Sequence, residues 1–347
     1  MRRGAAIASV CCAILLVALL TACTRAPQPV LDSREALGTF VDVTAYGEDE
    51  TAVRAAVGEA YAAMTEVEGA LDAHDPASPI ATLNADPYAG HPLPPEAIRV
   101  LDAVDELAVT ESFSPTLWSV VGLYDFEGEQ TVPAAGDLEL ALAAANGFVR
   151  RDDTGSFARV KTPDSRLEPG GALAPGLDFG GATKGLALDY GREILGKKSA
   201  IDAALITAGS TTVTLGNKPD GEPWRIGIED PRDTGTVLAT VETTDAIAVS
   251  TSGDYQRFFE VDGARYHHIL DPADGQPARG LRSLTVVGTH SGLESDILST
   301  ALFVMGPEKA IAYAEEHGLG LYLVDDEGRT QIVPGPEDRS WEIVPAG

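Results

Sequence analysis

From about residue 35 onward, apolar and polar residues recur with the two periodicities that are typical of strands and of amphipathic helices. They alternate over 36–46, which predicts a strand, and apolar residues recur at three- and four-residue spacing over 50–71, which predicts a helix. Further helices are predicted at 95–110, 135–146, 180–195, 296–304 and 307–317. Further strands are predicted at 203–210, 223–231, 319–324 and 330–333, with a β meander over 148–178. This order predicts an α+β fold, a single globule of mixed, largely antiparallel sheet with packed helices.

The stretch 250–300 places polar side chains at strand ends and at a helix start, where functional sites are commonly built. Two aromatic-rich strands are predicted here, joined by the hairpin Asp262-Gly263, and the second strand ends at His267-His268. Adjacent residues of a strand point to opposite faces, so these two imidazoles are poorly placed to chelate one ion.

Asp296 and Thr300 open the next apolar helical run and, being four residues apart, share one face of that helix. A carboxylate and a hydroxyl are hard oxygen ligands that suit Mg²⁺, whereas no pairing of Cys or His suggests zinc. The spacing alone leaves two interpretations open: two metal ligands, or an acid at a helix start together with a packed core threonine.

A second candidate segment is Leu177–Tyr190, in which a strand is predicted to end at Phe179 and a helix to follow the turn Gly180-Gly181. Glycines at such a turn let a ligand approach the backbone, and the free N–H groups of the first helical turn attract anions. Lys184 lies in that first turn, where a cation opposes the helix dipole, and this conflict favours a functional reason for it. The segment is neither a GxGxxG motif nor a P-loop, and alone it is weak evidence for a phosphate site.

The first 22 residues are typical of a secretory signal peptide. Arg2 and Arg3 precede an apolar run of about 16 residues, which is shorter than the roughly 20 of a spanning helix. Leu20-Thr-Ala-Cys23 resembles a bacterial lipobox, which implies that Cys23 carries lipid and becomes the new N-terminus; a plain membrane anchor is the alternative. Residues 23–34 are then expected to be a lipidated tether, and 35–340 the folded domain.

The composition suits an exported domain with a packed core. The chain has 347 residues, 44% of them hydrophobic, and its three cysteines all lie within the first 23 residues. Without Arg2 and Arg3, 23 basic residues remain against 53 acidic ones, and this net charge of −30 repels nucleic acid and anionic headgroups. An anionic ligand would therefore need local compensation from a metal, a helix start or one of the six lysines.

Three motifs, taken in order, resemble those of one family. Leu37-Gly-Thr, Asp178-x-Gly-Gly-x-x-Lys-Gly-x-x-x-Asp189 and SGDY…HHILDPADGQP…SDILST are similar to the motifs of the ApbE-type FAD:protein FMN transferases. The resemblance covers about residues 36–333. It implies an ApbE fold, which is T-fold-like. It also implies an Mg²⁺-dependent enzyme that transfers FMN from FAD to a threonine hydroxyl of an acceptor protein and releases AMP. The implied partners are FAD, the acceptor protein and the membrane through a lipid anchor, with no nucleic acid.

The flavin is expected to lie in a cleft between the parts before and after about residue 178, and the resemblance also implies which residues hold the metal. Mg²⁺ is expected on Asp296, on Thr300 and on a turn carbonyl, that of Gly181 or of Thr183. His268 is the candidate general base, because imidazole titrates near neutral pH. Its alternative role is only to hydrogen-bond the flavin or to brace the following turn.

By the same resemblance, FAD is expected to contact Leu37, His74, Ser114, Asp178, Lys184 and Leu270. Leu37 and Ser114 depart from the Met and Asp that are usual in the family, and Ser210 replaces a usual glycine. For His74 a solvated loop histidine is the alternative.

These departures leave two further functions open, an FAD-binding lipoprotein without transferase activity and a pyrophosphatase that splits FAD into FMN and AMP. The expected location is outside the cell interior, lipid-anchored at the outer face of the cytoplasmic membrane or on the periplasmic side.

Overall fold

The structure, a computed structural model, describes residues 28–347 except 90, 127, 147, 151–156 and 160–172. At its centre is an eight-stranded sheet in the order β1-β2-β5-β6-β9-β12-β13-β14, with every neighbouring pair antiparallel. Its strands are β1 Val30–Ala36, β2 Thr39–Tyr46, β5 Ala203–Ala208, β6 Thr211–Leu215, β9 Ala248–Gly253, β12 Leu281–Thr289, β13 Gly320–Asp325 and β14 Thr330–Val333. The predicted α+β fold with a largely antiparallel sheet is confirmed.

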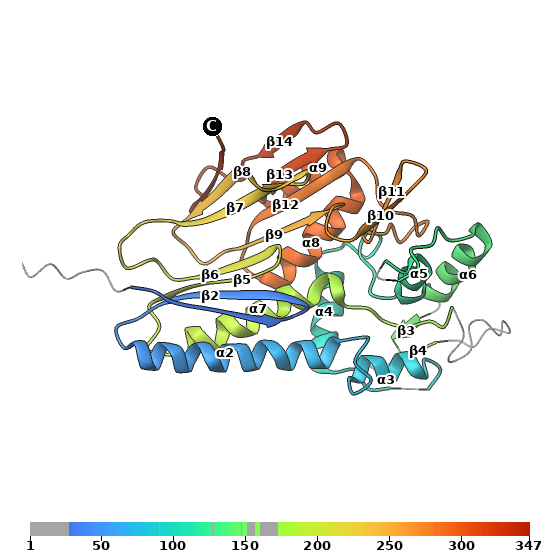
Figure 1. Ribbon diagram of the computed structural model, residues 1–347, viewed down its shortest axis with the longest axis horizontal. Helices are drawn as coiled ribbons and strands as arrows, with labels where there is room; N and C mark the ends of the chain where they lie inside the picture. Colours follow the sequence, from blue (N-terminus) through green and yellow to red (C-terminus); the bar gives the residue numbers. More distant parts are fainter. Residues whose placement is uncertain (1–27, 90, 127, 147, 151–156, 160–172) are drawn as a thin grey trace, which may run out of the picture.

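Helices cover one face of this sheet (Figure 1). α7 (Gly180–Gly196) and α8 (Gly292–Met305) lie against its strands, and the long α2 (Glu50–Leu71) packs on α7. The side chain of Asp49 caps the start of α2, whose apolar stripe is buried as its spacing predicts. Further helices are α3 Pro79–Ala85, α4 Pro95–Glu106, α5 Trp118–Tyr124, α6 Ala135–Ala145 and α9 Pro307–His317.

A smaller sheet, in the order β15-β8-β7, covers part of the opposite face. Apolar side chains of both sheets, among them Val249, Val287, Ile228 and Trp341, form a core between them. The strands of the small sheet are β7 Trp224–Asp230, β8 Asp233–Thr243 and β15 Trp341–Pro345. Two short antiparallel pairs complete the described strands: β3 Phe148–Arg150 with β4 Phe157–Arg159, and β10 Phe258–Val261 with β11 Ala264–His267.

The strand predicted at 36–46 is confirmed over Thr39–Tyr46, which is β2, but its start is wrong, because the chain turns back at Leu37 and Gly38. Leu37 and Gly38, with φ of 57° and 65°, form a two-residue turn between β1 and β2. Such turns match the twist of the flanking strands but need positive φ at both positions, which glycine adopts freely and leucine does not. Leu37 is nevertheless buried, 9% exposed, so its packing in the main core offsets the backbone cost.

The strand predicted to end at Phe179 is also not formed. Residues 174–179 are irregular, because their backbone groups bond to a side chain and a loop instead of a neighbouring strand. The Asn84 amide accepts from the Leu177 N–H at 2.7 Å and donates to the Leu177 carbonyl at 2.9 Å, and the Asp178 N–H donates to the Pro115 carbonyl at 2.7 Å. Most of the predicted meander over 148–178 lies outside the described residues.

α7 and α8 run antiparallel and touch through their backbones. A methyl group at Gly185 would lie 2.1 Å from the Gly292 carbonyl oxygen, so only glycine permits this approach. Asp189, one turn further along α7, accepts hydrogen bonds from the N–H groups of Gly292 and Leu293 and from the Ser291 hydroxyl. The carboxylate thereby caps the start of α8, where the helix dipole favours an anion.

A second, smaller apolar cluster lies apart from the main core. It joins α5 and α6 to the β10–β11 hairpin, and its members are Leu117, Val120, Tyr124, Leu138, Ala141, Ala144, Ala145, Leu173, Phe259 and Leu270. The Tyr124 hydroxyl donates to the Gly275 carbonyl at 2.8 Å, which fixes the loop after β11 to α5. One wall of the molecule, at the right in Figure 1, is therefore packed on its own core.

The N-terminal predictions, a signal peptide over 1–22 and lipidation of Cys23, lie outside the described residues. Within the part of the chain that the structure describes, no helix has the length and apolar character needed to cross a membrane.

Replacing Gly185 by alanine tests the helix contact. The new methyl group meets backbone atoms that cannot rotate away, so we expect the free energy of unfolding to fall by about 3 kcal/mol or more. Gly58→Ala in α2 is the matched control, since no atom lies within 4 Å of a methyl group there, and it should stabilise by roughly 0.5–1 kcal/mol. Urea unfolding measures both; equal midpoints for Gly185→Ala and the parent chain would contradict the contact.

Candidate functional site

The antiparallel pair of α7 and α8 brings the two candidate segments together. A methyl group at Gly181 would lie 3.9 Å from the Thr300 hydroxyl oxygen. One turn further, the Gly185 N–H donates to the Asp296 carboxylate (Oδ2) at 2.7 Å. The start of α7 and residues 296–300 of α8 therefore form one location, although more than 100 residues separate them in the chain.

Asp296 is a buried hydrogen-bond acceptor, 5% exposed, that links three elements. Besides the α7 contact at Oδ2, its Oδ1 accepts from the hydroxyls of Thr211 in β6 and, at 2.5 Å, Ser250 in β9. The interpretation of Asp296 as a helix-start acid is wrong, because α8 begins at Gly292 and is capped by Ser291 and Asp189. Three donors occupy three of the roughly four acceptor positions of a carboxylate, so one position at Oδ2 remains.

The oxygen atoms around this position fit a hard cation. Gly181 lies one helical turn before Gly185, whose N–H donates to Asp296. The Thr300 hydroxyl lies on the same helix face as Asp296 and 3.2 Å from the Ser252 hydroxyl. Carboxylate, hydroxyl and carbonyl oxygens are the ligands that Mg²⁺ takes in proteins. Among the described residues no group of three or more His, Cys, Asp and Glu side chains could hold a metal by itself.

The two histidines have different surroundings, as their alternation on the strand predicts. His267 is buried: its Nε2 donates to the Ala278 carbonyl at 2.9 Å, and its ring packs edge-on against Phe303 of α8. His268 is half-buried, and its Nδ1 donates to the Arg257 carbonyl at 3.2 Å. Because Nδ1 carries the proton, Nε2 is the basic nitrogen of His268.

His268 is sensitive to the positive charges around it. Burial, followed by the positive charge of Arg257 and a smaller contribution from Lys184, lowers the pKa of His268 to about 3. The imidazole is therefore neutral at physiological pH, which is the protonation state of a base.

Two hairpin tips lie beside the Lys184 side chain. A methyl group at Gly209, between β5 and β6, would lie 4.0 Å from Cδ of Lys184 and 3.7 Å from the Thr39 hydroxyl. Thr39 follows the Leu37-Gly38 turn, so this contact places the β1–β2 tip near the start of α7.

The other predicted FAD contacts surround the loop that leads into α7. The Asp178 carboxylate accepts from the Gly180 N–H at 2.8 Å, and the Ser114 hydroxyl lies 2.8 Å from that of Thr116 in the adjoining loop. The exposed His74 ring lies against Trp118, with 5.0 Å between centroids. Leu270 differs, because its side chain, 5% exposed, is packed in the second apolar cluster.

Sequence reasoning assigned no role to Asn84, Trp118 or Asp189, which position the site. Asn84 clamps Leu177, a methyl group at Gly176 would lie 2.5 Å from the Trp118 ring, and Asp189 caps α8. Asp189 ends the Asp178–Asp189 motif, so its spacing was a usable signal. Nothing local marks Asn84, since its partner lies 93 residues away.

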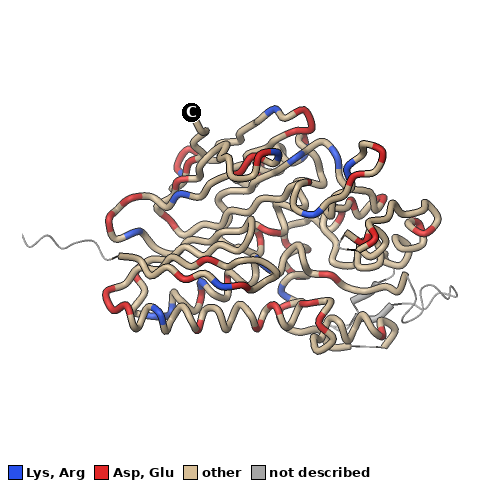
Figure 2. Tube along the Cα trace, viewed as in Figure 1, with Lys and Arg blue, Asp and Glu red and all other residues tan. Residues whose placement is uncertain are grey.

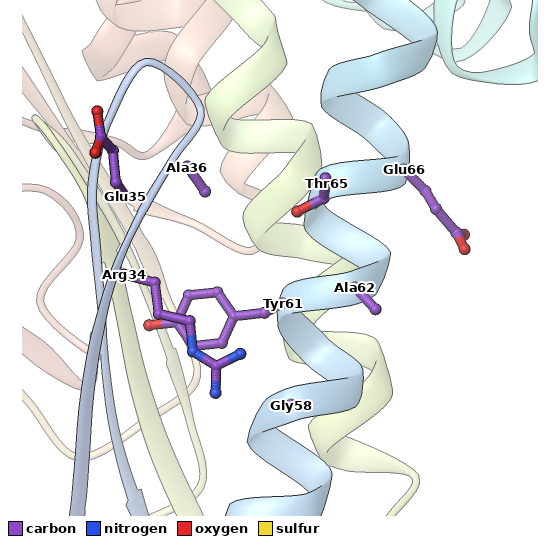
Figure 3. A pocket seen from close by; sticks show the side chains of 8 residues that line it. All are labelled: Arg34, Glu35, Ala36, Gly58, Tyr61, Ala62, Thr65 and Glu66. Carbon is purple, nitrogen blue, oxygen red and sulfur yellow. The ribbon is translucent and has the colours of Figure 1, made fainter.

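A cavity of about 500 Å³ lies between β1 and α2, away from these residues (Figure 3). Tyr61 reaches from α2 toward β1, with the Arg34 guanidinium 4.1 Å from its ring centroid. None of the predicted site residues lines this cavity.

The sequence and the fold are similar to those of known proteins. Residues 37–323 match the model of the ApbE family, so the chain belongs to that family. It is 32% identical, over 87% of its length and 86% of the relative's, to an FAD:protein FMN transferase of Treponema pallidum. The crystal structure of the ApbE protein of Thermotoga maritima aligns with a TM-score of 0.77 at 29% identity, over 88% of this chain and 96% of that one. The crystal structure of the flavinyl transferase ApbE of Pseudomonas stutzeri aligns with a TM-score of 0.72 at 30% identity, over 89% of this chain and 95% of that one.

The lowered pKa of His268 predicts a pH dependence of stability. In the unfolded chain His268 is protonated below about pH 6.5, whereas in the folded chain it is protonated only below about pH 3. The free energy of unfolding is therefore highest above pH 6.5 and decreases as the pH falls from 6.5 toward 3. Relative to the parent, His268→Gln should gain roughly 1–2 kcal/mol in unfolding free energy between pH 7.5 and pH 5. Urea unfolding at both pH values measures this.

His317→Gln, on the exposed surface of α9, is the control for removing an imidazole. A constant stability difference between His268→Gln and the parent across this range would show that His268 titrates normally.

Proposed function

We propose that this protein is an FAD:protein FMN transferase that moves FMN from FAD to a threonine hydroxyl of an acceptor protein. The threonine oxygen forms a new bond to the FMN-side phosphorus, the bond from that phosphorus to the bridging oxygen breaks, and AMP leaves. Family membership and the relatives that carry this activity in their names support the proposal. One observation carries it. The start of α7, with Gly181 and Lys184, lies against Asp296 and Thr300 of α8, and His268 is near enough to Lys184 for that charge to lower its pKa.

Such a reaction requires positioning, charge neutralisation and removal of the hydroxyl proton. Nε2 of His268 takes the proton of the attacking threonine, because it is the unprotonated nitrogen of a neutral imidazole. The Lys184 ammonium and the N–H groups at the start of α7 face the diphosphate and favour its negative charge. His74, Asp178 and Ser114 hold the remainder of FAD at the loop before α7.

Asp296, Thr300 and the Gly181 carbonyl would hold Mg²⁺, with the free position of Oδ2 as the charged ligand. When bound, this ion neutralises charge on the phosphoryl oxygens and the leaving phosphate. Thr211, Ser250 and the Gly185 N–H fix the Asp296 carboxylate in place, so the ligand is oriented before any cation binds.

Incubating the purified protein with FAD, Mg²⁺ and candidate acceptor domains, followed by a denaturing gel, tests the proposal directly. Protein-bound flavin fluorescence is the expected result. Free FMN and AMP without labelled protein would instead assign a pyrophosphatase, and unchanged FAD a binding protein.

Thr300→Val tests the metal ligands without breaking the hydrogen bonds around Asp296. The valine keeps the shape but removes an oxygen ligand, so the Mg²⁺ concentration for half-maximal transfer should rise tenfold or more. Ser295→Ala, on the same helix, is the control: its buried hydroxyl has no hydrogen-bond partner among the described residues, so Mg²⁺ dependence should stay unchanged. Overlapping Mg²⁺ curves for Thr300→Val and the parent would end the assignment of Thr300 as a ligand.

We further propose that the protein is exported and anchored to the membrane by lipid on Cys23, on the outer side of the cytoplasmic membrane. The lipobox-like Leu20-Thr-Ala-Cys23 at the end of a signal-like segment supports this. β1 begins at Val30, so only a short tether would separate the lipid from the folded domain.

Cys23→Ser tests the anchor in cells. The variant cannot accept the lipid, so it should accumulate as unprocessed or soluble protein while its purified domain keeps FMN transfer. Fractionation and gel mobility measure the outcome, and a variant that fractionates and migrates like the parent would refute lipidation.

A further inference from the structure

A cavity of about 300 Å³ with an arginine-rich lining lies at the junction of three segments. Arg232 comes from the β7–β8 turn, Arg265 from β11, and Arg279 and Arg282 from the start of β12 and the residues before it. Elsewhere the acidic positions outnumber the basic ones widely, as Figure 2 shows along the trace. Four guanidinium groups around one cavity therefore stand out in this chain.

Two of the four arginines neutralise acids of the same cavity. Arg232 makes a two-pronged ion pair with Asp254, with both N–O distances 2.6 Å, and Asp254 is only 6% exposed. Arg265 bonds Glu260 at 3.0 Å and lies 3.6 Å from Asp254. These pairs hold the turn and the hairpin together and leave little charge for a ligand.

The other two arginines bond only to backbone carbonyls. Arg279 donates to the Arg265 carbonyl at 3.1 Å, and Arg282 donates twice to the Asp326 carbonyl, at 3.1 and 2.6 Å. The Asp326 carboxylate accepts from the Gly280 N–H at 2.8 Å. Neither Arg279 nor Arg282 forms an ion pair within the described ranges, so two guanidinium charges at this cavity have no carboxylate partner. Arg279 is exposed, and most of its donors are available to a ligand.

The cavity adjoins the proposed active site through the end of β11. His267 lines the cavity, and His268, the next residue, lies near enough to Lys184 for that charge to lower its pKa. Along β9, Ser250 bonds Asp296, Ser252 lies beside Thr300, and Asp254 reaches the cavity. The same strand thus runs from the proposed metal position to the arginines.

We propose that Arg279 and Arg282 bind an acidic side chain of the flavin acceptor and so align its threonine with His268. This rests on the proposed transferase function. In the proposed function Lys184 and the start of α7 face the diphosphate of FAD, and neither of them lines this cavity, so the arginines are left for a second anion. Charge complementarity favours the acceptor, because an acidic segment is repelled by most of this surface and attracted here. Arg forms paired hydrogen bonds with a carboxylate, which also fixes direction.

The test compares Arg279→Gln, Arg279→Lys and the control Arg225→Gln, which removes an exposed arginine paired with Glu242 in the small sheet. With an acceptor that the parent chain labels, KM for the acceptor should rise about tenfold in Arg279→Gln and less in Arg279→Lys. FAD affinity and kcat should change less than twofold, and added salt should raise KM of the parent more than that of Arg279→Gln. Arg225→Gln should behave as the parent.

A second arm uses inorganic phosphate as the probe and does not depend on transfer. Titrated into the full chain saturated with FAD, phosphate should shift the amide resonances of Ala278 and Gly280 in the parent and not in Arg279→Gln. An unchanged KM in Arg279→Gln, or phosphate-induced shifts as large in Arg279→Gln as in the parent, overturns the acceptor site. Failure of the parent to label any acceptor would instead reject the transferase function, and the phosphate titration would still decide whether the cavity binds anions.

Discussion

The close approach of α7 and α8 is the constraint on which the rest of the structure depends. Gly185 and Gly292 let the two backbones touch, and the antiparallel helical repeat then sets three further pairs in register. Gly181 lies near Thr300, the Gly185 N–H donates to Asp296, and Asp189 accepts from the first N–H groups of α8. A methyl group at Gly185 or at Gly292 would lie 2.1 Å or 2.6 Å from the carbonyl oxygen of the other glycine, so the two backbones would have to move apart. The proposed metal ligands would then no longer converge.

Buried carboxylates join the elements of this acidic chain to one another. Asp189 ties α8 to α7, Asp296 ties both helices to the central sheet, and Asp254 ties β9 to the turn of the small sheet. Each carboxylate accepts hydrogen bonds from several donors, which offset the free-energy cost of burying its charge. Within the described chain, the side chains that organise the proposed site are thus also ones that hold the layers together.

The sequence predicts the helices better than the path of the chain between them. α2, α9 and β14 occur where the periodicity places them, because an apolar stripe reports directly on which face is buried. The turn at Leu37-Gly38 and the irregular 174–179 were missed, since a leucine at positive φ and an amide clamp from Asn84 leave no periodic trace. The motifs placed Asp296, Thr300 and Gly181 in one location, but the hydroxyls of Thr211 and Ser250 that surround Asp296 depend on strand order, which spacing does not encode.

The second apolar cluster affects which residues of this chain can be substituted without disturbing the main core. Ser114, where the chain departs from the family's usual aspartate, lies in the loop before α5, whose Val120 and Tyr124 pack in this cluster. A substitution there can be absorbed by α5, α6 and the β10–β11 hairpin without disturbing the glycine contact of α7 and α8. Residues of the loop before α5 can therefore vary while the arrangement at the helix pair is retained.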